Sequence, residues 1–138
     1  MITTINIEQM LAENGFCVTG ITGTSMLPML RQGEDRVLLV RPEFPLQPGA
    51  VALYKLGQDY VLHRVIANKD GVYRIRGDNC AADEFVPEAQ ILGVLSGFWR
   101  GGTYHDCTGK ENAAFAEKAK RTLPFRRLKA AIAAWINR

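Results

Sequence analysis

The sequence predicts a mainly β protein, with a compact, barrel-like antiparallel β core, a short N-terminal helix and an amphipathic C-terminal helix. Several short apolar, β-branched runs are separated by turn-forming residues, which is typical of antiparallel strands. Helical periodicity occurs only at the two ends of the chain. We therefore expect one domain over residues 1–138, with a β core at about 16–104 and a helical tail at about 111–138.

The predicted N-terminal helix covers residues 7–14. Asn6 is a suitable N-cap because its side-chain oxygen can accept a hydrogen bond from the first turn, and Gln9 completes a capping-box pattern. Gly15 is a suitable stop, because glycine readily adopts the left-handed conformation that ends many helices. Residues 16–21 then predict a short strand that leads into a serine-containing turn.

The central part of the chain predicts further strands at residues 36–40, 50–56, 60–67, 72–76 and 91–100. The strongest turn signal between them is Asn68-Lys69-Asp70-Gly71, since Asp-Gly supplies the positive φ angles of a tight hairpin. The strand at 60–67 carries His63, which lies on the same face as Val61 and Val65 because side chains alternate along a strand.

The tail predicts helix instead of strand. Residues 112–120 are helix-prone, and Pro124 ends that pattern or restarts it, since proline is favoured in the first turn of a helix. Beyond it, apolar residues recur with helical spacing at Leu128, Ala131, Ile132, Trp135 and Ile136. Arg126, Arg127 and Lys129 lie largely off this stripe. Such a helix either lies on an anionic membrane surface or packs on the β core or a second copy.

Composition narrows the class of protein. A hydrophobic content of 47% with 22% charged residues excludes a disordered chain. The net charge of +3 reflects cations gathered near the C-terminus, without interleaved aromatic residues or a known motif, so we expect no binding to nucleic acid. His105 and Cys107 lack the further ligands of a metal site, and we expect no metal or cofactor.

The expected compartment is the cytoplasm, with a candidate peripheral contact to an anionic membrane through the C-terminal helix. The three cysteines include no Cys-x-x-Cys pair, and an odd number argues against a disulfide framework. The sequence has no signal-peptide pattern and no apolar run near the roughly 20 residues that a membrane span needs.

The most informative stretch is Gly23-Thr24-Ser25-Met26-Leu27-Pro28. Glycine permits turns that other residues resist, and the proline three residues after the serine restrains the following chain. Together they can present the Ser25 hydroxyl at a fixed angle. By itself the stretch also fits an ordinary turn before a short helix.

Two later blocks strengthen the case for chemistry at Ser25. His63 stands in the run Val61-Leu62-His63-Arg64-Val65, and Arg76-Gly77-Asp78-Asn79 closes the next strand. A serine hydroxyl needs a base to take its proton, and histidine suits this role because its ordinary pKa is near 6.5. A buried core histidine and a turn-capping Asp78 are the structural alternatives.

The order of these blocks resembles the type I signal peptidase family, whose superfamily includes the self-cleaving SOS and phage repressors. The resemblance covers Gly20 to Gly93, about half of the chain, and is closest to the serine–histidine (endoplasmic-reticulum-type) branch, because His63 stands before Arg64-Val65. It implies an antiparallel β fold and a serine endopeptidase with Ser25 as nucleophile and His63 as general base.

The chain departs from that family at two points. Ala50 follows Gly49 where the family usually has an acid, and the N-terminal membrane span of the signal peptidases is absent from the sequence given. The chain therefore resembles a short form without a transmembrane segment.

Several residues compete for the supporting roles. Lys55 is the rival base, although a solvated strand lysine is the expected role. The acid that orients His63 is predicted to be Asp83, with Asp78 second and Glu84 third. The resemblance also assigns the oxyanion and substrate-binding positions, to the backbone N–H of Ser25, the Gly23 turn and Met26 beside the nucleophile.

These observations predict a signal-peptidase-like serine endopeptidase that cleaves an extended peptide or leader segment by a Ser–His mechanism. The substrate would bind as an added strand beside the cleft. The alternative is a non-catalytic peptide-binding module that retains the fold.

Overall fold

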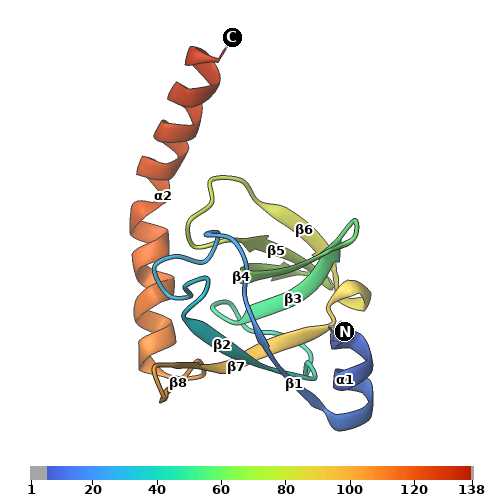
Figure 1. Ribbon diagram of the computed structural model, residues 1–138. Helices are drawn as coiled ribbons and strands as arrows, with labels where there is room; N and C mark the ends of the chain where they lie inside the picture. Colours follow the sequence, from blue (N-terminus) through green and yellow to red (C-terminus); the bar gives the residue numbers. More distant parts are fainter. Residues whose placement is uncertain (1–5, 138) are drawn as a thin grey trace.

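The computed structural model describes residues 6–137, which form one antiparallel sheet with a helix at each end of the chain (Figure 1). The helices are α1 (Ile7–Asn14), the 3₁₀ turn η1 (Glu88–Gln90) and α2 (Lys110–Ile136). The strands are β1 (Phe16–Gly20), β2 (Asp35–Val40), β3 (Val51–Leu56), β4 (Asp59–Lys69), β5 (Val72–Arg76), β6 (Glu84–Pro87), β7 (Gly93–Arg100) and β8 (Thr103–Asp106).

The mainly β fold class is confirmed, but the sheet is open and not closed into a barrel. The eight strands pair antiparallel in the order β1-β2-β7-β3-β4-β5-β6, and β8 pairs with the end of β7. β1 uses one edge to pair with β2, and β6 uses one edge to pair with β5. Within residues 6–137 these two strands do not pair with each other, so the expected closure is wrong.

The local signals of the sequence are confirmed where they are strongest. The Asn6 side chain accepts a hydrogen bond from the Gln9 N–H at 3.0 Å, and Gly15 ends α1 with a φ of 80°. Asp70 and Gly71 turn the β4–β5 hairpin with φ angles of 52° and 83°. The sequence did not predict β6, β8 or η1, each of which is only three or four residues long.

The tail forms one continuous helix, so the expected break at Pro124 is wrong. Proline removes one backbone donor, but nearby side chains satisfy carbonyls of the preceding turn. The Thr122 hydroxyl donates to the Lys118 carbonyl at 3.0 Å, and the Arg126 guanidinium donates to the Ala119 carbonyl at 2.9 Å. Within the described residues no helix is both long enough and apolar enough to cross a membrane.

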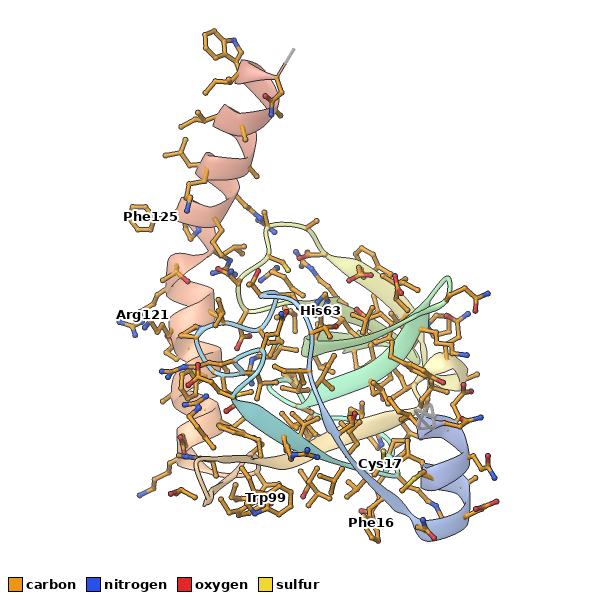
Figure 2. All side chains as sticks on the ribbon, viewed as in Figure 1. Phe16, Cys17, His63, Trp99, Arg121 and Phe125 are labelled. Carbon is orange, nitrogen blue, oxygen red and sulfur yellow. The ribbon has the colours of Figure 1, made fainter. Side chains whose placement is uncertain are left out.

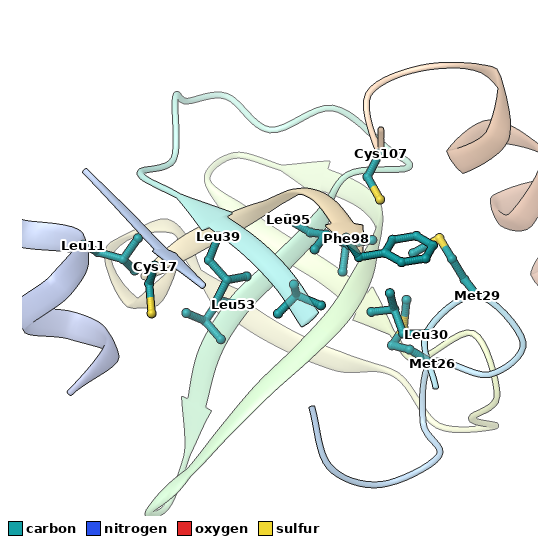
Figure 3. Packing of buried hydrophobic residues seen from close by; sticks show 12 residues of the cluster. Leu11, Cys17, Met26, Met29, Leu30, Leu39, Leu53, Leu95, Phe98 and Cys107 are labelled. Atoms are coloured by element: carbon teal, nitrogen blue, oxygen red, sulfur yellow. The ribbon is translucent and has the colours of Figure 1, made fainter. Parts of the chain in front are cut away.

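The buried side chains form two clusters. The larger one fixes the serine loop, residues 21–34 between β1 and β2. Figure 3 shows Met26, Met29 and Leu30 of this loop pointing into the same cluster as residues of the sheet and of α1, such as Leu11 and Phe98. All three loop side chains are at most 4% exposed. The burial of three apolar side chains stabilises one conformation of the loop that carries Ser25.

Candidate active site

The Gly77-Asp78-Asn79 turn forms hydrogen bonds to the backbone of the serine loop. The Asn79 N–H donates to the Ser25 carbonyl at 2.9 Å, and the Asn79 side-chain amide donates to the Thr24 carbonyl at 3.1 Å. The Asp78 N–H also contacts the Met26 sulfur at 3.4 Å. The two blocks that stand more than fifty positions apart in the sequence therefore form one structural unit.

Ser25 and His63 line the same cleft, whose volume is about 600 Å³. Gly77 lies against both the Ser25 carbonyl and the His63 ring. A Cβ at Gly77 would lie 2.8 Å from the Ser25 carbonyl oxygen and 3.1 Å from His63 Cδ2, so no larger residue fits there without displacing one of them. Cδ2, the ring carbon bonded to Nε2, is thus the His63 atom that approaches Gly77. Figure 2 labels His63, whose side chain is 12% exposed.

No hydrogen bond joins the Ser25 hydroxyl to His63 within residues 6–137. Catalytic hydrogen bonds are often long without substrate and shorten when it binds. The cleft therefore contains the Ser25 hydroxyl and the His63 imidazole, the two groups that the sequence predicts as nucleophile and base.

The acid that orients His63 is Glu84, so the prediction of Asp83 is wrong and the third choice is correct in geometry. Glu84 Oε1 lies 3.0 Å from His63 Nδ1 and accepts a hydrogen bond from the Tyr54 hydroxyl at 2.9 Å. An acceptor at Nδ1 favours the tautomer with the proton on Nδ1. That tautomer leaves the Nε2 lone pair free to accept a proton.

The alternation of side chains along a strand explains why Glu84, and not Asp83, contacts His63. Glu84 pairs with Ile75 across β5 and β6, and Ile75 packs in the same cluster as Tyr54. Asp83, one residue earlier, belongs to the opposite face, where its carboxylate accepts from Arg74 at 2.6 Å and from Arg76 at 2.5 Å. Asp83 therefore neutralises two arginines and does not contact His63.

Sequence reasoning did not predict Tyr54 as a member of the site. Tyr54 pairs with Val61 across β3 and β4, so it is the diagonal neighbour of His63 on the same face. Burial and the neighbouring Glu84 raise the pKa of the Tyr54 phenol, which keeps the hydroxyl protonated as a donor. An alignment of the two predicted strands could have indicated this contact.

Asp78 is also not the orienting acid. Its carboxylate accepts two hydrogen bonds from Arg64, at 2.7 and 2.8 Å, and the side chains of this pair are only 1% and 2% exposed. Arg64 further donates to the Gly49 carbonyl at 2.8 Å and to the Asn112 side chain at 2.7 Å. This buried network borders a second hollow of about 920 Å³, which lies between α2 and the loop before β3.

The environment of His63 suits a general base. Burial lowers the pKa of His63 below its ordinary value of 6.5, and the charge and hydrogen bond of Glu84 oppose this shift without cancelling it. The imidazole is therefore neutral, and able to accept a proton, at neutral pH.

Lys55 has the solvated role that the sequence indicates. Its ammonium lies 2.9 Å from the Glu8 carboxylate, and the side chain is 41% exposed. The hydrogen bond to Glu8 raises the pKa of Lys55, whereas a lysine base requires a lowered pKa. Lys55 is thus unsuited to activate Ser25.

The predicted oxyanion donors differ in availability. The Ser25 N–H has no acceptor within the described part of the chain, so it is free to bind an oxyanion. The Gly23 N–H donates to the Gln32 side chain and would have to exchange this partner to serve as a second donor. Met26 lines the cleft, although its side chain is mostly buried in the core.

Comparison with known proteins adds no family assignment, since no protein-family model and no curated protein matches this chain.

Glu84→Gln is expected to slow acylation of Ser25 by an active-site probe by roughly 10²- to 10⁴-fold, because the amide no longer holds His63 in the productive tautomer. Asp83→Asn is the matched control, because it changes the adjacent acid in the same way without touching His63. The measurement is the second-order rate constant of labelling for each folded variant. Equal losses in both variants would contradict the assignment of Glu84.

Proposed function

We propose that this protein is a serine endopeptidase of signal-peptidase-like type, with Ser25 as nucleophile, His63 as general base and Glu84 as the residue that orients His63. The observation that carries the proposal is the hydrogen bond between Glu84 and His63 Nδ1 at 3.0 Å, which leaves Nε2 as the free nitrogen of a ring that lines the same cleft as Ser25. The resemblance of the ordered sequence blocks supports the same reaction.

The proposed reaction follows acyl-transfer chemistry. Ser25 Oγ attacks the scissile carbonyl while His63 Nε2 takes its proton, and the backbone N–H of Ser25 stabilises the oxyanion. The imidazolium, stabilised by Glu84, then donates its proton to the leaving amine. Water attacks the acyl-enzyme by the same route, so that Ser25 and neutral His63 are restored.

The substrate is proposed to be an extended peptide, or a leader segment, that adds as a strand. Residues 59–63 of β4 pair with β3 on one side, whereas β5 pairs with β4 only from Arg64 onward. The free edge of residues 59–63 faces the cleft, whose other wall is formed by residues 19–23. A peptide in this gap can form backbone hydrogen bonds to β4 and place its carbonyl near Ser25.

Because Cys17, Cys80 and Cys107 are unpaired, we further propose a reducing compartment such as the cytoplasm.

A serine-directed acylating probe tests this function without knowledge of the natural substrate. We expect labelling of Ser25 alone, with a rate that rises with pH through an apparent pKa below 6.5, because only neutral His63 acts as a base and burial lowers its pKa. Glu84→Gln should move this pKa further down, since Glu84 favours the charged imidazolium. The measurement is the labelling rate from about pH 4 to 10.

Two results would contradict the proposal. The absence of labelling in the folded protein would favour a non-catalytic peptide-binding module. A rate that still climbs steeply above about pH 9 would instead indicate a lysine base.

A further inference from the structure

We propose that the C-terminal half of α2, residues 125–136, docks on an anionic lipid surface as an interfacial helix. This inference does not rest on the peptidase function, because no residue of this segment lines the cleft that contains Ser25 and His63. It rests on the exposure of an apolar face, on the charge of α2 from Lys118 onward and on the way α2 is fixed to the domain.

The apolar face of this segment is not covered by the protein. Its large side chains are Phe125, Leu128, Ile132, Trp135 and Ile136, with exposures of 70%, 57%, 48%, 67% and 66%. Figure 1 shows this half of α2 extending beyond the sheet, and Figure 2 shows Phe125 pointing away from it. The alternative that the stripe packs on the β core is therefore wrong for the described residues.

The charge of the segment selects the partner. Residues 118–137 contain no aspartate or glutamate but six cations, namely Lys118, Lys120, Arg121, Arg126, Arg127 and Lys129. Figure 2 shows Arg121 on the same side of α2 as Phe125, one turn earlier. Apolar residues beside unbalanced cations fit the acyl boundary and the headgroups of an anionic membrane. Two such helices side by side would bring like charges together, which disfavours a second copy as the partner.

The sequence alone suggests that all six cations can contact lipid. Two of them are instead bound to the domain. Arg126 donates to the Cys80 carbonyl at 2.7 Å, and Arg127 donates to the Ala81 carbonyl at 3.3 Å and lies 3.8 Å from Asp83. These contacts fix α2 to the loop that precedes β6. Lys120 lines the hollow between α2 and the loop before β3, so the lipid contact is assigned to Lys118, Arg121 and Lys129, which have no ion-pair partner within residues 6–137.

The test is co-sedimentation of the full chain with vesicles, carried out on the Ser25→Ala variant. This variant separates the question from catalysis, so that a failure of lipid binding and a failure of the peptidase function are distinguishable. One vesicle preparation contains phosphatidylcholine with about a third phosphatidylglycerol, and the other contains phosphatidylcholine alone. We expect binding to the anionic vesicles at low salt that weakens about tenfold or more in 0.5 M salt or without anionic lipid.

Matched variants localise the contact. Phe125→Glu should lower the binding at least about tenfold, because it places a carboxylate in the apolar face. Phe16→Glu is the control: it makes the same change at another exposed phenylalanine, 47% exposed and located on β1. In a Trp99→Phe background, the emission of Trp135 should shift to shorter wavelength on anionic vesicles.

Three outcomes would overturn the proposal: no binding to anionic vesicles at low salt, equal binding to both kinds of vesicle, or equal losses for Phe125→Glu and Phe16→Glu. A dimer that Phe125→Glu dissociates, without vesicle binding, would assign the face to a second copy.

Discussion

Replacing Ser25 or His63 with alanine is expected to lower kcat/KM for peptide cleavage by a factor on the order of 10⁶. Without Ser25 no acyl-enzyme can form, and without His63 the hydroxyl keeps its proton and remains a poor nucleophile. The double variant should be hardly worse than either single variant, because the two side chains act as one unit. The measurement is cleavage of a peptide selected from a library, with the folded state checked by circular dichroism.

Lys55→Ala is the control for this experiment, because it removes the rival base. We expect its kcat/KM to stay close to that of the unmodified protein, since the Lys55 ammonium contacts Glu8 at the surface. If Lys55→Ala lost the activity while His63→Ala kept most of it, the assignment of the base would be wrong.

Asp78→Ala is expected to lower the free energy of unfolding by about 3–5 kcal/mol, the largest stability effect that the structure predicts. The substitution leaves the Arg64 guanidinium buried without a counter-charge, since the Arg64 side chain is only 2% exposed. Urea unfolding followed by fluorescence measures the change.

Glu34→Ala provides the contrast, because Glu34 also pairs with an arginine but does so in solvent. The Arg31–Glu34 pair spans 3.6 Å with both side chains about half exposed, so its loss should cost less than about 1 kcal/mol. Similar losses for Asp78→Ala and Glu34→Ala would show that burial of the Arg64–Asp78 pair does not determine its contribution.

Local patterns in the sequence determine most of the fold. The cap at Asn6, the stop at Gly15 and the Asp70-Gly71 hairpin each depend on residues within a few positions, and all three are confirmed. The predicted strands agree with the structure to within about two residues, whereas β6 and β8 are too short to show periodicity. Pro124 was misleading because distant features of the tertiary structure, such as the contacts of Arg126, override a local preference.

The candidate site was only partly predictable for a related reason. The sequence places Ser25 and His63 by their local context, but the choice between Asp83 and Glu84 depends on which face of β6 each occupies. That face follows from the pairing of Glu84 with Ile75, and the sequence did not predict β6 at all. The contacts of Arg64 were also not predictable from the sequence, because they come from residues up to 48 positions away.

The contacts of Arg64 also bear on how the site can open. This one side chain bonds to Asp78, to the Gly49 carbonyl and to Asn112 of α2, and its Nη2 lies 3.5 Å from the sulfur of Met29. Local opening of the serine loop would therefore expose a buried charge network that also anchors β4 and α2. We expect these segments to exchange their amide hydrogens together as one cooperative unit and not as separate loops. We therefore expect the backbones that carry the proposed nucleophile and base to open together with β4 and α2.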